Sequence, residues 1–210
     1  MDPKEVVRQG YDRISRAYRG DRIEHDNPEH ARYIAWIDEL TGLLPAGAEV
    51  LDLGCGNGVP ADRLLADAGF GVTGADISPV QIARAQAAVP GARFLCADMT
   101  ALDLPAASYD AVVSLYAIIH VPLAEQPALL DRVCRWLRPG GYLLLTVGHQ
   151  AWTGTEEGWL GVEGVPMYWS HADTATYAGW LVARGLEIRW SRFVPEDEGG
   201  HTLVLARKPR

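Results

Sequence analysis

Val50-Leu51-Asp52-Leu53-Gly54-Cys55-Gly56-Asn57-Gly58 decides the fold of this chain. The stretch has the pattern of a buried strand that runs into a glycine loop, and a predicted helix follows through Leu64 and Leu65. This layout directs backbone N–H groups and the positive end of a helix towards a small polar or anionic ligand. The glycines let the ligand lie directly against the backbone, where a Cβ atom would collide with it. The stretch therefore predicts a ligand-binding unit of an α/β protein.

Asp76 ends a second predicted strand, and a carboxylate at that place can accept both hydroxyls of a ribose. NAD-binding loops have similar glycines, but the third glycine position of their fingerprint requires Gly or Ala, and this chain has Val59 there. Asp52, two residues before the first glycine, suits a ligand with an ammonium group and would oppose a pyrophosphate. The pattern favours S-adenosylmethionine (SAM), which carries a ribose, an adenine and a methionine amine.

Four segments together resemble the class I SAM-dependent methyltransferases, and their order and spacing match that family over residues 45–150. The segments are Glu49-to-Gly58, Gly74-Ala75-Asp76-Ile77-Ser78, Cys96-Ala97-Asp98-Met99 and Leu137-Arg138-Pro139-Gly140-Gly141. The chain looks most similar to small bacterial enzymes that methylate quinones and natural products. Residues after 150 resemble family members only loosely, and substrates are usually selected there.

The apolar pattern predicts alternating strands and helices, and its nearly all-apolar strands are typical of a parallel sheet covered on both faces. We expect strands near 49–53, 71–75, 92–96, 110–115, 141–147, 186–194 and 201–207, and helices near 3–17, 28–40, 58–68, 79–88, 125–137 and 173–184. The resemblance implies a Rossmann-like, doubly wound sheet of seven strands, mostly parallel, with one antiparallel C-terminal strand. We expect one domain, with a helical lid (1–44), a SAM-binding core (45–150) and a substrate-side insertion with a C-terminal hairpin (151–210).

The resemblance assigns the cofactor contacts to the carboxyl ends of the strands, where such sheets bind ligands. Asp76 would accept the ribose hydroxyls, and its alternative role is a charge at the N-terminus of the following helix. Asp98 would accept the adenine amine beside the Met99 backbone N–H, or it is a simple loop acid. The predicted cofactor set is Tyr18, Asp52, Gly54, Gly56, Asn57, Gly58, Asp76, Ile77, Asp98, Met99 and Leu115. Asp110 lies at the opposite end of its strand and is predicted to be structural.

Methyl transfer requires an aligned acceptor atom and, for a hydroxyl acceptor, removal of a proton. Histidine suits that task near neutral pH. His120 and His149 follow the fourth and fifth strands and are the predicted bases, ranked above His171; a packing or capping role stays open for each. Tyr11 and Tyr18 are predicted to position groups over the methyl, because their helix is expected to cover the site.

Residues 150–190 contain five of the seven tryptophans. Trp152, Trp159 and Trp169 are expected in loops, which usually lie at the surface, so we interpret them as walls of a pocket for a flat, largely apolar acceptor. The predicted acceptor-binding residues are Tyr11, Trp152, Trp169 and His171. Glu156 and Glu157 would instead suit a cationic amine, so O-methylation and N-methylation both stay open.

Composition limits the remaining possibilities. The net charge of −8 and the absence of a basic cluster outside the C-terminal tail disfavour a nucleic-acid partner. No apolar run is long enough to span a membrane, and the first residues lack the pattern of a signal peptide. The three cysteines lack CxxC spacing, which is typical of buried thiols in a reducing cytoplasm. The sequence has no cluster of carboxylates after the fourth predicted strand, so we expect no metal site. We expect a cytoplasmic monomer or homodimer that acts on a small molecule. The alternatives are a SAM-binding sensor or cyclase and an NAD-dependent oxidoreductase.

Overall fold

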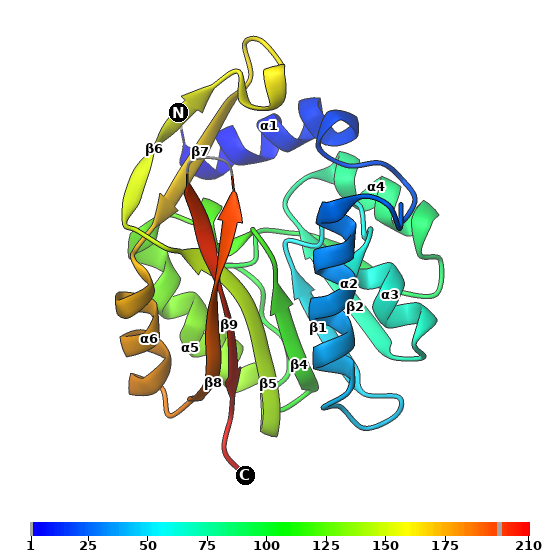
Figure 1. The fold of residues 1–210 in the computed structure, drawn as a ribbon, viewed down its shortest axis with the longest axis vertical. Coiled ribbons are helices and arrows are strands. Elements are labelled where there is room, and N and C mark those ends of the chain that lie inside the picture. The colour runs from blue at the N-terminus through cyan, green and yellow to red at the C-terminus, as the bar shows by residue number, and fades with distance from the viewer. Residues whose placement is uncertain (1, 197–198) are drawn as a thin grey trace.

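A seven-stranded sheet with helices on both faces forms the centre of the computed structural model, which describes residues 2–196 and 199–210 (Figure 1). Its strand order is β3-β2-β1-β4-β5-β9-β8. Of the seven described strands of this sheet, β9 alone runs in the opposite direction to the others, so the predicted fold class is confirmed. The strands are β1 (Glu49–Leu53), β2 (Gly71–Asp76), β3 (Arg93–Cys96), β4 (Tyr109–Ser114), β5 (Leu137–Gly148), β8 (Glu187–Glu196) and β9 (Gly199–Arg207).

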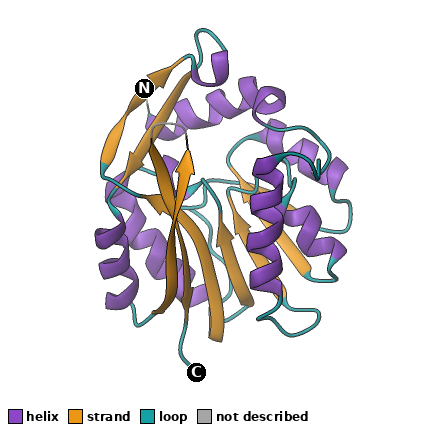
Figure 2. Ribbon diagram, in the orientation of Figure 1, coloured by secondary structure: helices purple, strands orange, loops and turns teal. Residues whose placement is uncertain are grey.

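Helices pack on both faces of the sheet (Figure 2), and four of the six described α-helices begin at a side-chain cap. Asp2, Asn27 and Ser78 each accept a backbone N–H of the first turn, and a proline follows each of them at the start of the helix. The helices are α1 (Pro3–Tyr18), α2 (Pro28–Thr41), α3 (Ala61–Asp67), α4 (Pro79–Ala88), α5 (Gln126–Trp136) and α6 (Thr174–Ala183). Within the described part of the chain, no helix combines the length and the apolar character needed to cross a membrane.

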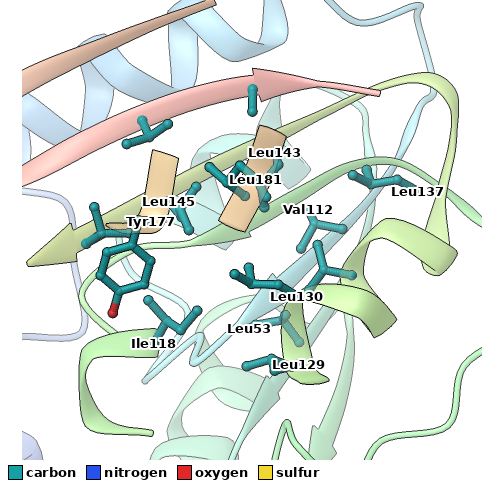
Figure 3. Close-up of a cluster of buried hydrophobic side chains, with 14 of the residues drawn as sticks. Leu53, Val112, Ile118, Leu129, Leu130, Leu137, Leu143, Leu145, Tyr177 and Leu181 are labelled. Carbon is teal, nitrogen blue, oxygen red and sulfur yellow. The ribbon is translucent and has the colours of Figure 1, made fainter. Parts of the chain in front are cut away.

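Two apolar layers hold the sheet, because successive side chains of a strand point to opposite faces. On β4, Val112 packs towards α5 and α6, while Val113 packs towards α2 and α3. Figure 3 shows the first layer, in which Leu130 of α5 and Leu181 of α6 lie among leucines of the sheet. At the amino ends of the strands, Asp110 accepts the Glu49 N–H at 2.9 Å and pairs with Arg138, which confirms its structural role.

The predicted loops around the tryptophans are instead a second, two-stranded sheet. Strands β6 (Trp152–Glu157) and β7 (Pro166–His171) pair in an antiparallel hairpin, so Trp152 and Trp169 lie on strands. The loop prediction was wrong because β6 is mostly exposed and has no apolar alternation. Packing on α1 stabilises the hairpin, since Val165 and Met167 are buried against Val7 and Ile14.

Candidate functional site

A cavity lies between α1 and the carboxyl ends of β1, β2, β3 and β4, and it encloses about 620 Å³ including its open mouth. Helix α1 contributes Lys4, Val7, Tyr11 and Tyr18, and the strand ends contribute Gly54, Gly56, Asp76, Ile77, Asp98, Met99, Leu115, Tyr116, Ala117, His120 and Val121. Eight of the eleven residues of the predicted cofactor set line this cavity.

The glycine loop forms the floor of the cavity. Gly54 and Gly56 have φ values of +81° and +56°, a region that side chains with a Cβ rarely adopt. A Cβ at Gly54 would lie 2.1 Å from the Ala117 Cβ, so this contact requires glycine. A Cβ on Gly56 would meet no atom closer than 3.9 Å and would project into open space. Gly58 packs against Ala85 and Val89 without lining the cavity, which makes it a turn residue and not the cofactor contact predicted for it.

Asp76 holds the loop and faces the cavity at the same time. Its Oδ2 accepts the Gly56 N–H at 2.9 Å, and its Oδ1 accepts the Ser78 N–H at 2.8 Å. Burial raises the pKa of the carboxyl to about 6, although these backbone bonds lower it. The predicted ligand role and the alternative role at the helix N-terminus are therefore compatible in one carboxylate.

Asp98 lines the cavity together with Lys4, a residue that was not predicted from the sequence. Lys4 of α1 donates to Asp98 Oδ2 at 2.7 Å and also pairs with Glu125. Burial would raise the pKa of Asp98, but hydrogen bonds from Lys4 and Thr100 outweigh it, so the pKa is lowered. Lys4 carries no local signal, because its partner lies 94 positions away in the sequence.

A second, smaller cavity adjoins the main cavity at the glycine loop, and both an acidic and a basic side chain line it. Its walls include Asp52, Asn57 and Arg19, the residue that follows α1. The Arg19 guanidinium is buried, donates to Glu29 at 2.5 Å, and stacks on the Tyr33 ring at 4.6 Å. Arg19 Nε and Asp52 Oδ1 are both buried without a hydrogen-bond partner among residues 2–196 and 199–210. An acid and a base with unused polar atoms match the ammonium and carboxylate groups of an amino acid.

His120 stands at the other side of the main cavity in an aromatic cluster. Its Nδ1 lies 2.6 Å from the Tyr168 carbonyl oxygen, and its Nε2 lies 3.0 Å from the Tyr11 hydroxyl. Trp169 stacks on the imidazole with ring centroids 4.2 Å apart, and Trp159 meets Trp169 edge-on at 5.2 Å. Burial lowers the pKa of His120 to about 4, although the bond to Tyr168 opposes this shift. The imidazole is therefore neutral at neutral pH.

The main cavity is not lined by the second predicted base, His149, or by three predicted acceptor residues, Trp152, Trp169 and His171, although Trp169 stacks on His120, which does line it. His149 is exposed, packs on Phe193 with ring centroids 4.5 Å apart and contacts Thr202. Trp152 is 46% exposed on β6, and His171 bonds to the Gln150 carbonyl oxygen. Trp152 and His171 are instead cross-strand partners at one end of the β6–β7 hairpin, which was not expected. Tyr116, which has a φ of +56°, does line the cavity, although it was not among the predicted site residues.

Comparison with known proteins agrees with this geometry. A family model described as a methyltransferase domain matches residues 50–141. The 2-methyl-6-phytyl-1,4-hydroquinone methyltransferase of Synechocystis sp. is 39% identical over 110 residues, which are 51% of this chain and 34% of that protein. The chain spans between a third and a half of the length of the curated relatives it matches.

Solved structures extend the likeness to nearly the whole chain. The magnesium protoporphyrin IX methyltransferase of Synechocystis PCC 6803, crystallised with S-adenosylhomocysteine, superposes with a TM-score of 0.72 at 21% identity and covers 99% of this chain and 100% of that one. The [4+2]-cyclase SpnF has a TM-score of 0.74 at 21% identity and covers 96% and 94%. Residues 50–141 therefore match a methyltransferase domain, and nearly the whole chain has the fold of the class I SAM-dependent methyltransferases.

Proposed function

We propose that this protein transfers the methyl group of SAM to an oxygen atom of a small, flat, largely apolar metabolite. The observation that carries the proposal is the arrangement of the main cavity, which has the glycine loop and Asp76 at one side and the Tyr11–His120 pair at the other. One side fits a nucleoside with an amino-acid tail, and the other offers a proton acceptor to a second molecule.

The charged groups of the two cavities assign the cofactor contacts. Asp76 would take the ribose hydroxyls, and Asp98 with the Met99 backbone would take the adenine. Asp52 would accept the ammonium group of the tail, and Arg19 would bind its carboxylate. When bound there, SAM supplies a methyl group activated by a sulfonium centre. The protein then has to align the acceptor and remove its proton.

The hydrogen bonds of His120 define which of its nitrogens takes that proton. The carbonyl oxygen of Tyr168 is an acceptor, so Nδ1 carries the hydrogen and Nε2 keeps its lone pair. The Tyr11 hydroxyl donates to Nε2 and lines the cavity. An acceptor hydroxyl bonded to Tyr11 can pass its proton through the Tyr11 hydroxyl to Nε2 while the methyl moves. His120 is the proposed base and Tyr11 the residue that positions the acceptor.

The walls around this pair select the class of acceptor. Tyr18, Trp159 and Trp169 surround Tyr11 and His120 with aromatic faces and edges, which suit a flat ring. Glu156 and Glu157, which would favour a cationic amine, are exposed on β6. We therefore favour a phenolic or hydroquinone oxygen over an amine. The hydroquinone named for the Synechocystis relative belongs to that chemical class.

Transfer of label tests this function. The protein is incubated with methyl-labelled SAM and a panel of hydroquinones, phenols and aromatic amines, and the products are analysed by mass spectrometry. We expect a labelled O-methyl product from at least one phenol or hydroquinone, and a rate at least about 100-fold lower for His120→Ala. SAM binding without transfer to any member of the panel would favour a sensor or a cyclase, and labelled amines alone would contradict the oxygen preference.

A further inference from the structure

Asp62 is a buried carboxyl group that the proposed reaction does not use. It lies in the first turn of α3, directly beneath the glycine loop, and its Oδ2 is 3.5 Å from the place of a Cβ on Gly58. Asp62 is 0% exposed, and Asp52, against which its carboxyl lies, is 3% exposed. Both Asp62 oxygens and Asp52 Oδ1 lack a donor in the described part of the protein. Carboxyl groups in contact at such depth share a proton unless cations compensate them.

The charges around the pair provide too little compensation for two carboxylates. Arg19 approaches Asp52 from the end of α1, but the same guanidinium is already paired with Glu29 of α2. Asp76 approaches from β2 and adds negative charge. The other titratable groups that face this region are Cys55 of the loop and Tyr18 and Tyr33 of α1 and α2. Burial raises the pKa of all three, so they remain neutral near neutral pH.

We propose that Asp62 is a positioning residue for the cofactor's amino-acid tail: its carboxyl group keeps its proton and donates a hydrogen bond to Asp52, whose ionised form accepts the ammonium group. A hydrogen bond from Asp62 spares Asp52 the full cost of burial as an anion. The inference rests on the proposed cofactor contacts, and it does not depend on the identity of the acceptor.

The arrangement couples cofactor binding to pH. Burial raises the pKa of Asp52 to about 7, and the hydrogen bond from Asp62 opposes that rise. The pKa of Asp62 is raised well above its ordinary value, first by burial and then by Asp52. Asp62 is fully buried and does not line the cavity, whereas Asp52 lines it together with Arg19, so Asp62 is the member of the pair that retains the proton. Only the ionised form of Asp52 is competent to bind an ammonium group. As the pH falls below about 7, SAM therefore has to displace a proton, and its apparent Kd rises about tenfold per pH unit.

Titration of SAM into wild type, Asp62→Asn and Asp62→Leu tests the proposal without any acceptor. The Asn amide can replace the donated hydrogen bond, whereas Leu has a similar size and no donor. Calorimetry in two buffers of different ionisation enthalpy gives both the Kd and the number of protons released. Methylthioadenosine is the matched control ligand, because it has the ribose and adenine of SAM but no ammonium group.

We expect SAM to bind wild type and Asp62→Asn about tenfold more weakly at about pH 6 than at about pH 8, with proton release at the lower pH. Asp62→Leu should bind SAM at least about tenfold more weakly at neutral pH, with its pH profile moved upward. Methylthioadenosine should bind all three proteins with the same affinity, which would show that the site is folded in each of them. Any pH dependence of its binding reports on Asp76 and the ribose, so the remaining pH dependence of SAM binding reports on Asp52.

Two results would overturn the role of Asp62: SAM binding by Asp62→Leu that equals wild type, or a loss in Asp62→Asn as large as in Asp62→Leu. Wild type that binds methylthioadenosine but not SAM would overturn it as well. Failure of methyl transfer with normal, pH-dependent SAM binding would instead contradict the proposed activity and leave the Asp62 inference supported.

Discussion

Burial sets the chemistry of individual side chains in this protein. His120 is kept neutral by its surroundings, while Asp52 and Asp76 titrate closer to neutral pH than exposed aspartates do. The glycine loop and Asp76 could be predicted from sequence, because their roles follow from local backbone geometry and position after a strand. Arg19, Lys4 and Asp62 could not be predicted, because their partners come from other elements and nothing in their neighbouring residues marks them.

The low pKa of His120 predicts a specific dependence of stability on pH. The ordinary pKa of histidine is 6.5, and the folded protein lowers it to about 4, so between these values the unfolded chain binds more protons. Wild type should lose stability as the pH falls from about 6.5 towards about 4, by up to about 3 kcal/mol from this group. His120→Gln should lack this contribution. Urea denaturation of both proteins across this range measures it, and equal pH slopes would refute it.

At the scale of elements, most strands and helices could be predicted because apolar pattern, caps and turns agree. Strand β1 has the predicted bounds, and α4 spans the predicted residues 79–88. Helix α3 is shorter than expected and begins at Ala61, because Gly58, Val59 and Pro60 belong to the loop. Strands β6 and β7 could not be predicted, because contacts with α1 stabilise them and α1 lies far away in the sequence.

The contact between α1 and β7 depends on Gly10. A Cβ there would lie 2.8 Å from Met167 Cε and 3.2 Å from the Pro166 carbonyl oxygen. Gly10→Ala should therefore destabilise the protein by about 1 kcal/mol despite the higher helix propensity of alanine. Gly179→Ala in α6 is the matched control, since a Cβ there meets nothing within 4 Å, and it should stabilise by about 0.5 kcal/mol. Thermal denaturation measures the change in Tm of each variant relative to wild type. Equal changes in Tm for both variants would mean that α1 and β7 are not in close contact.

At the scale of the whole molecule, the sheet and the segments above it have different roles. The strand ends provide the proposed cofactor contacts, and α1 with the β6–β7 hairpin surrounds the proposed acceptor (Figure 1). The matched methyltransferase domain covers residues 50–141, which include the strand ends but neither α1 nor the hairpin. The acceptor side could therefore be predicted only in outline, as an aromatic pocket.

This division predicts that acceptor binding and cofactor binding can be changed separately. Trp169→Ala removes the ring stacked on His120 and should raise the acceptor KM about tenfold or more while leaving the SAM Kd unchanged. Trp152→Ala, on the neighbouring strand, should change neither value, because Trp152 is largely exposed. Steady-state kinetics with any phenol methylated by wild type measures the difference. Equal KM values for both variants would place the acceptor elsewhere.

Titration of SAM into wild type and Asp76→Ala, with NADH as the control ligand, tests the central claim most directly. We predict micromolar SAM binding by wild type and no binding of NADH. Asp76→Ala should bind SAM at least about tenfold more weakly, because a buried carboxylate no longer accepts the ribose. Binding of NADH in place of SAM, or SAM binding that does not depend on Asp76, would contradict the proposed cofactor site.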